Sequence, residues 1–176
     1  MTSDPVSDPA CDLAHGLPAD ATANPTGTVV AVFASQVADH LLHFAAHLGW
    51  RGVLFDPDTS RLDTAGRTES IDRLDGVDLT GADVVVTDHD RAELGSALRA
   101  ALAGEARWVG VMGSRRHPPP HVPALRDLGV ADEAIARVHR PIGLDIGSRA
   151  PAEIALATMA GLLADRRGRT GGFGST

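Results

Sequence analysis

The sequence predicts an α/β fold in which a doubly wound parallel sheet lies between two layers of helices. An apolar run at Thr28–Phe33, helical spacing of apolar residues over Gln36–Leu48 and a second apolar run at Gly52–Phe55 form a strand–helix–strand unit. Apolar runs return at Ala82–Thr87 and Arg107–Met112. Continuous apolar runs are typical of strands buried on both faces, and such units join parallel strands through right-handed crossovers.

The length of 176 residues favours a single domain. We predict an ordered domain over residues 27–167, a disordered or loosely packed leader over residues 1–26 and a flexible tail over residues 168–176. The leader is rich in Asp, Pro, Ala and Thr and shows no periodicity. The single cysteine, Cys11, lies in this leader. Because the chain has only one cysteine, an internal disulfide and a cysteine-rich metal centre are excluded.

Charge and hydropathy exclude several classes of function. The formal charge is −7 and the chain contains no lysine, so a nucleic-acid binder is not expected. No apolar run approaches the roughly 18 residues that a membrane helix needs. The N-terminus shows no basic segment followed by an apolar one, as a secretion signal would. We therefore expect a cytoplasmic protein that binds neither membranes nor nucleic acids.

The first strand–helix unit has only part of a dinucleotide-binding pattern. An acidic residue at the end of the second strand binds ribose in such units, and Asp56 occupies that place. The glycine pattern of the first turn is replaced by Phe33, Ser35 and Ala38, and a phenylalanine is not expected to adopt the tight turn of a glycine. The helix start at Ser35 and Gln36 still offers amides to an anion. We expect weak or absent NAD(P) binding here.

The middle of the chain leaves two interpretations open. Residues 58–81 are polar and lack a helical pattern, so we interpret them as a long connection. The strand Ala82–Thr87 leads to Asp88–Asp90, at the edge where open α/β sheets bind ligands. These side chains supply acid–base chemistry, or Asp90 caps a helix predicted at Arg91–Leu102; we favour the cap.

Three histidines share one arc of the first predicted helix. His43 and His47 have the i,i+4 spacing of a metal-binding pair, and His40 lies beside them. No cysteine or carboxylate cluster completes a ligand set. We therefore predict a solvated helix face and no metal site.

The fourth strand contains Gly110 and ends in a glycine turn that carries two arginines. Backbone amides of Gly113 and Ser114, together with the guanidinium groups of Arg115 and Arg116, would form a cradle for an anion. The alternative is that the arginines pair with carboxylates of this acidic protein.

Helices complete the second half of the chain. Prolines after the arginine turn delay the next helix to about Pro123–Gly129, and a short helix follows at Asp132–Val138. The long helix Pro151–Arg166 begins with a proline, which suits the first helical position, and its small alanines could pack in the core or in a homodimer.

A second glycine turn, at Pro141–Gly147, leads into this long helix. It contains Gly143, Asp145 and Gly147. Glycines permit backbone angles and close approaches that a side chain blocks. Two such turns in one small domain predict a pocket lined by backbone.

Two segments resemble motifs of a known family, the xanthine dehydrogenase accessory factors (XdhC/CoxI). They are Trp108-Val-Gly-Val-Met-Gly-Ser-Arg-Arg116 and His139-Arg-Pro-Ile-Gly-Leu-Asp-Ile-Gly-Ser-Arg-Ala-Pro-Ala-Glu-Ile-Ala155. Weaker similarity to the C-terminal domain of that family extends over Thr28–Leu162. The resemblance implies a Rossmann-like domain and a role in handling molybdenum cofactor for molybdo-hydroxylases, together with partner proteins such as a cofactor sulfurase.

The chain departs from the family pattern at several points. The first 26 residues do not match the N-terminal domain of the family, which suggests a separate, shortened paralogue. The family's glycine-containing first turn is Phe33–Ala38 here, and its capping Thr or Ser is Ala150. The family has Thr-His after its third strand, whereas this chain has Thr87-Asp88-His89, with an aspartate between the two residues.

Three functions are therefore compared. The first is an accessory protein, rather than an enzyme, that binds molybdenum cofactor or a phosphate and docks a molybdo-hydroxylase or sulfurase. The second is a scaffold without a ligand, and the third is an NAD(P)-dependent oxidoreductase. We expect the accessory protein.

Overall fold

A six-stranded parallel sheet forms the centre of the molecule in the computed structural model, which describes residues 27–62, 69–75, 77–114 and 116–172. The leader, Cys11 and Arg115 therefore lie outside the described residues. The strand order is β3-β2-β1-β4-β5-β6. The strands are β1 (Thr28–Val32), β2 (Arg51–Phe55), β3 (Glu69–Ile71), β4 (Ala82–Val86), β5 (Trp108–Val111) and β6 (Val138–His139). This order confirms the predicted doubly wound, Rossmann-like sheet.

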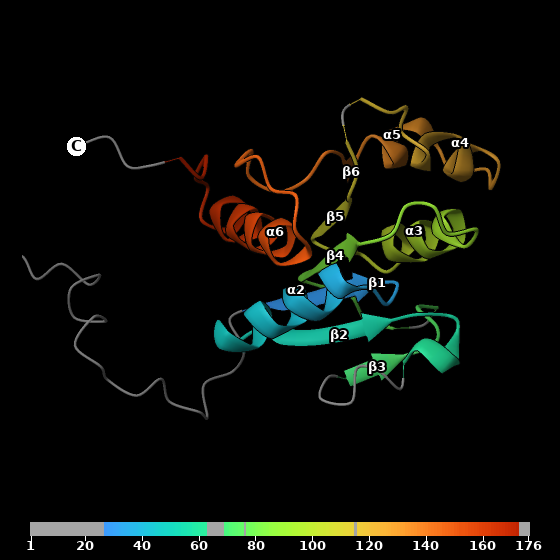
Figure 1. Cartoon of the computed structure of the whole chain (residues 1–176). Coiled ribbons are helices and arrows are strands. Elements are labelled where there is room, and N and C mark those ends of the chain that lie inside the picture. Colours follow the sequence, from blue (N-terminus) through green and yellow to red (C-terminus); the bar gives the residue numbers. More distant parts are fainter. Residues whose placement is uncertain (1–26, 63–68, 76, 115, 173–176) are drawn as a thin grey trace, which may run out of the picture.

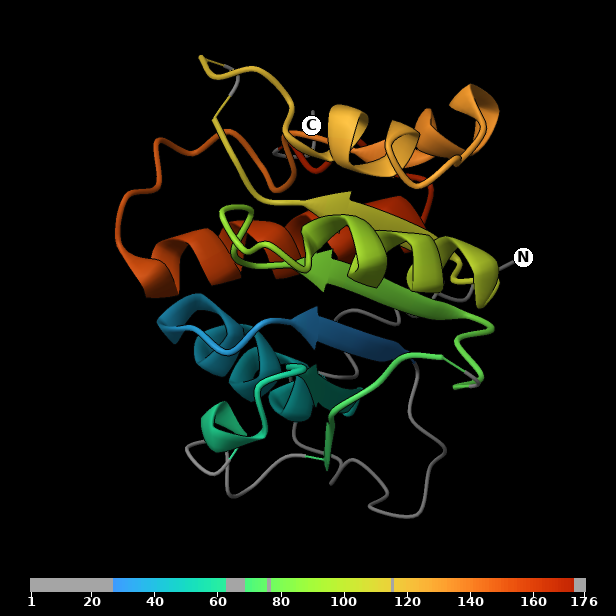
Figure 2. The same cartoon turned by 90° about the vertical axis from the view of Figure 1, so that its right-hand side faces the viewer.

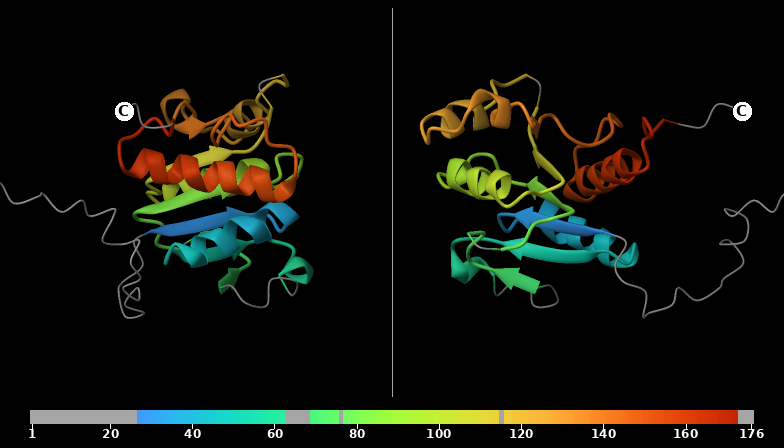
Figure 3. Two further views of the ribbon diagram at one scale, coloured as in Figure 1. Left: turned by 60° about the vertical axis from the view of Figure 1, so that its left-hand side comes forward. Right: turned by 180° about the vertical axis from the view of Figure 1, so that it is seen from behind.

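Helices cover both faces of the sheet and make the predicted three layers. Helices α2 (Gln36–His47) and α6 (Pro151–Arg166) lie side by side on one face, as both halves of Figure 3 show. The opposite face carries α3 (Leu94–Ala103), α4 (His121–Arg126) and α5 (Asp132–Ile135), on the right of Figure 1. A short 3₁₀ turn, η1, spans Thr59–Arg61.

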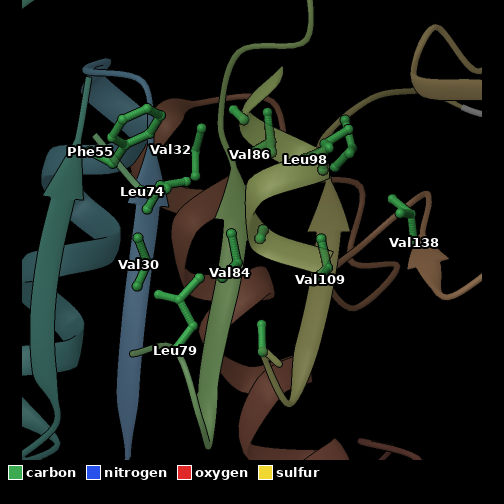
Figure 4. Close-up of a cluster of buried hydrophobic side chains, with 14 of the residues drawn as sticks. Val30, Val32, Phe55, Leu74, Leu79, Val84, Val86, Leu98, Val109 and Val138 are labelled. Carbon is green, nitrogen blue, oxygen red and sulfur yellow. The ribbon is translucent and has the colours of Figure 1, made fainter. Parts of the chain in front are cut away.

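The hydrophobic core is divided by the sheet because alternate strand residues point to opposite faces. Val30, Val84 and Val109 point towards α3, where they pack in one cluster with Leu98 of that helix (Figure 4). Val29, Ala31 and Val85 point the other way, into a core shared with α2 and α6. The central strands β1 and β4 are thus buried on both faces, as their apolar sequences predict.

Two short strands were not predicted. The sequence predicts a connection over residues 58–81, yet Glu69–Ile71 pairs in parallel with β2, from Val53↔Glu69 to Phe55↔Ile71. The sequence predicts a helix that ends at Val138, yet Val138 and His139 pair with β5. Both strands lie at sheet edges, where one side meets solvent, and their sequences carry only one apolar residue each to signal burial.

Two helices begin elsewhere than predicted. Helix α3 begins at Leu94 rather than Arg91, and Asp90 does not cap it: the Asp90 amide instead donates to the Asp88 carboxylate at 3.1 Å. Helix α4 begins at His121 and includes Pro123 within its first turn, where the missing amide proton costs no helical hydrogen bond.

The predicted ends of α4 and α5 were also too late. Helix α4 ends at Arg126 and α5 at Ile135, and the residues after each helix form turns. Helix α5 has only one turn because Val138, which the sequence places in this helix, belongs to strand β6.

An ion-pair network joins helix α6 to the amino-terminal edge of the sheet. The fully buried carboxylate of Asp83 accepts hydrogen bonds from Arg107 at 2.7 Å and from Arg166 at 2.8 Å. Arg107 also reaches Asp165 at 2.6 Å, and the Arg166 guanidinium stacks on Trp50 at 4.7 Å. This network fixes the far end of α6 and leaves its start at the opposite edge.

Among the described helices, none has the length and apolar character required to cross a membrane.

Candidate functional site

The two predicted glycine turns meet at the carboxyl-terminal edge of the sheet. The segments that follow β5 and β6 both extend beyond this edge, on the left of Figure 2. Together they line an open pocket of about 630 Å³. The lining residues are Gly113, Ser114, Arg116, Pro141, Ile142, Gly143, Leu144, Asp145, Ile146, Gly147, Ser148 and Arg149. Six of the predicted site residues are therefore brought together here.

The turn after β5 contributes a guanidinium and a hydroxyl to the pocket. The amide of Arg116 donates to the Ser114 Oγ at 3.1 Å, and the exposed Arg116 side chain forms no ion pair within the described part of the chain. The alternative that this arginine pairs with one of the protein's own carboxylates is thus not realised in this structure.

The turn after β6 packs directly on helix α6. Gly143 has a φ of +85°, and a Cβ there would come within 3.2 Å of the Thr158 backbone nitrogen. The next amide, of Leu144, donates to the Ala157 carbonyl at 3.1 Å. Gly147 also has a positive φ, of +70°, but a Cβ added there would meet no atom within 4 Å. Gly143 thus permits close contact with α6, whereas Gly147 only turns the backbone.

Helix α6 begins without the serine or threonine cap of the family pattern. Ala150 has no side-chain acceptor, and the carboxylate of Glu153 instead accepts from the amides of Arg149 at 2.9 Å and Ala150 at 3.1 Å. These two hydrogen bonds lower the pKa of Glu153. The carboxylate therefore occupies amides just before the first turn of the helix.

Gly110, a predicted binding residue, lies outside the pocket. A Cβ at Gly110 would overlap the ring of Trp108 and approach Ile142 within 2.8 Å. The Trp108 ring in turn stacks on His139, with the ring centroids 4.9 Å apart. The structure places Gly110 where these side chains need room against β5.

The first turn is closed by the chain itself. Phe33 is fully buried at a φ of +73°, so the expectation that it could not adopt a glycine-like turn is wrong. Its ring lies 6.4 Å from that of Phe55 and beneath the Arg91 guanidinium, 4.9 Å from the ring centroid. Packing on both sides holds the backbone in a conformation that a free phenylalanine avoids.

Ser35 and Gln36 have different environments at the start of α2. The Ser35 hydroxyl accepts from the Ala38 amide at 3.1 Å, as an N-cap, and donates to Thr87 Oγ1 at 2.9 Å. Thr87 donates in turn to the Phe33 carbonyl at 2.8 Å. Gln36 is exposed. The cap therefore joins the first turn to the end of β4.

Asp56, the predicted ribose acceptor, is fully buried and has four donors. Its Oδ2 accepts from the Ala34 amide at 2.9 Å and from Arg91 at 3.4 Å. Its Oδ1 accepts from the Asp58 amide at 3.0 Å and from Arg91 at 3.3 Å. A carboxylate offers about four acceptor positions. A ribose hydroxyl would therefore have to displace Arg91.

The histidines of α2 are exposed. The Nε2 atoms of His43 and His47 lie 3.1 Å apart, as in a hydrogen-bonded pair. No group of three or more His, Cys, Asp or Glu side chains with metal-binding geometry occurs among the residues whose positions are described.

Two residues that sequence reasoning missed lie behind the turn after β5. The Arg140 guanidinium packs against Gly113, where a Cβ would come within 2.7 Å of Nε. Arg140 Nη1 donates to the His117 carbonyl at 3.1 Å. His121, the first residue of α4, is 5% exposed; its burial and then the charge of Arg140 lower its pKa. A histidine and an arginine among prolines gave no sequence pattern by which to predict this pair.

Comparison with known proteins identifies the family. A family model described as the XdhC Rossmann domain matches residues 29–162. The chain belongs to this family. The match spans β1 to most of α6, and so includes both turns of the pocket in the XdhC Rossmann domain.

Two individual proteins are similar to this XdhC Rossmann domain. The uncharacterized protein YqeB of Escherichia coli (strain K12) is 32% identical over 120 residues, which are 68% of this chain and 21% of YqeB. A crystal structure described as a xanthine dehydrogenase from Bacillus halodurans has a TM-score of 0.66 at 21% identity, over 82% of this chain and 45% of that one. The chain thus spans about a fifth of the first protein and less than half of the second, and the solved structure supports the fold.

Proposed function

We propose that this chain is an accessory protein in the maturation of xanthine dehydrogenase-type molybdoenzymes. In this proposal it binds molybdenum cofactor, or another ligand that carries a phosphate, in the pocket between the two glycine turns, and docks a partner protein. Family membership supports the accessory role, and the shape and charge of the pocket support a ligand.

The observation that carries the proposal is the convergence of the two motifs in one pocket. Its volume of about 630 Å³ lies within the usual range for small-molecule sites. Arg116 and Arg149 line it, and Asp145 is the one acidic residue among the described lining residues. Guanidinium groups and backbone are suited to an anionic ligand. The site residues thus fit a cofactor that carries a phosphate.

An NAD(P)-dependent oxidoreductase is disfavoured by the first turn. The Asp56 carboxylate is saturated by its own chain, and the ring of Phe33 fills the turn beneath Arg91. We therefore expect no nicotinamide cofactor at this place.

The proposed partners are a molybdo-hydroxylase and a cofactor sulfurase, and a homodimer is a further possible assembly. Two large apolar side chains suit such docking because they are more than half exposed: Ile146 at 56%, in the pocket wall, and Leu156 at 52%, on α6. A partner bound at Ile146 would lie at the mouth of the pocket.

Calorimetric titration with isolated molybdenum cofactor, under anaerobic reducing conditions, tests the proposal. We expect binding by the wild-type protein, weaker binding by Arg116→Ala, and unchanged binding by Arg99→Ala, which removes the same charge from an exposed position on α3. Parallel titrations with NAD⁺ and NADP⁺ should show no heat of binding. Partner capture without any cofactor binding would support the scaffold instead.

A further inference from the structure

Three buried polar atoms lack a hydrogen-bond partner in the described part of the chain, and all three belong to one cluster. They are Nε and Nη2 of Arg140 and Nδ1 of His121. Buried donors are normally paired, and a buried charged donor without a partner is costly. A cluster of three therefore requires an explanation.

The cluster lies immediately behind the pocket. Arg140 directly precedes Pro141, and its guanidinium packs on Gly113; both Pro141 and Gly113 line the pocket. Arg140 Nη1 donates to the carbonyl of His117, four residues before His121, and the charge of Arg140 contributes to lowering the pKa of His121. Both side chains thus lie at the carboxyl-terminal edge of the sheet, where open α/β folds bind ligands.

The chemistry of the cluster calls for an oxyanion. No carboxylate of the described residues forms an ion pair with Arg140; its one hydrogen bond goes to the carbonyl of His117. Nε and Nη2 form one edge of the planar guanidinium, which matches two oxygens of a phosphate. A third oxygen can accept from His121 when Nδ1 carries the proton.

We propose that Arg140 and His121 form a binding site for a phosphate group. This inference deepens the proposed function, since the phosphate would belong to the ligand of the adjacent pocket. Gly113 is then required because any side chain would displace the guanidinium from this position. The three atoms are enclosed in this conformation, so neighbouring side chains must move apart when the anion binds.

The test uses inorganic phosphate, pyrophosphate and a nucleoside 5′-monophosphate as probes, at an ionic strength matched with chloride. Calorimetry and thermal unfolding of the full chain should both detect binding. Arg140→Gln should weaken binding at least tenfold, the loss expected for a charged hydrogen bond. Arg140→Lys should restore only part of it, and Arg99→Gln, a matched change on an exposed helix face, should leave it unchanged.

A second measurement needs no change at Arg140. Phosphate should shift the imidazole nitrogen resonances of His121 in the wild-type protein, with His121→Gln used to assign the signals. Absence of any response to the three probes, or equal binding by Arg140→Gln and Arg99→Gln, would overturn the proposal. Phosphate binding without cofactor binding would leave this site established and refute the cofactor role, so the two proposals fail separately.

Discussion

Phe33 shows how one side chain can replace a glycine. A residue other than glycine at a φ of +73° costs on the order of 1 kcal/mol, and a buried phenylalanine ring contributes roughly 3–5 kcal/mol. Packing therefore outweighs the backbone strain. The sequence pattern identified the unusual residue correctly, but the sign of this balance depends on Phe55 and Arg91, which lie far along the chain.

A pair of variants separates the two terms at Phe33. Both Phe33→Ala and Phe33→Gly lose the ring, and we expect both to be destabilised by several kcal/mol. The glycine variant should be the more stable of the two by about 1 kcal/mol, because glycine accepts the positive φ. Urea unfolding measures both. A glycine variant that is no more stable than the alanine variant would show that Phe33 does not hold this backbone angle.

His121 should give the protein a dependence on pH. Its folded-state pKa is lowered by burial and by Arg140, so the unfolded chain takes up a proton more readily. Its contribution is fully present above the unfolded pKa of about 6.5 and is lost as the pH falls through the lower folded value. The Tm advantage of wild type over His121→Gln should therefore shrink on acidification in phosphate-free buffer. The exposed His40→Gln serves as the control, and a gap that is independent of pH would contradict the expectation.

Among the elements, the segment between β6 and α6 depends on two glycines for different reasons. Gly143 combines a φ of +85° with close contact to the α6 backbone, whereas Gly147 has only the positive φ. Gly147→Ala should cost about 1 kcal/mol, and Gly143→Ala should cost clearly more, about 2–3 kcal/mol. Chemical denaturation of the two variants provides the comparison; equal losses would mean that the helix contact yields easily.

The long elements were predictable and the short ones were not. Strands β1, β2, β4 and β5 and helices α2 and α6 follow from their apolar patterns, because each strand run or helix face with such a pattern packs into the core. Strands β3 and β6 are held by pairing with a neighbouring strand, which local sequence does not encode. The start of α3 was predicted wrongly for a similar reason, since Asp90 forms a local turn with Asp88 and does not cap the helix.

The site divides in the same way. Glycine motifs and the family resemblance predicted the two turns that line the pocket. The roles of Asp56, Arg91 and Arg140 arise from partners distant in sequence, and no spacing rule could have joined them.

At the scale of the whole molecule, Asp83 links the sheet to α6. Its carboxylate is fully buried between Arg107 and Arg166. Asp83→Asn leaves the partly buried Arg166 guanidinium without a carboxylate partner and Arg107 with only the half-exposed Asp165, and we expect a loss of about 3 kcal/mol or more by urea unfolding. The exposed pair of Arg51 and Glu69 provides a contrast, because Glu69→Gln should cost less than about 1 kcal/mol. Similar losses at the two positions would refute the central role of Asp83.

The closed first turn has a consequence for the unliganded protein. In a turn that packs only when a nucleotide is bound, the backbone amide hydrogens exchange with solvent as long as the ligand is absent. Here Phe33, Asp56 and Arg91 already complete the packing. Hydrogen–deuterium exchange in β1, β2 and the start of α2 should therefore be slow and indifferent to added ligand, while any protection gained on binding appears in the amides of residues 141–149.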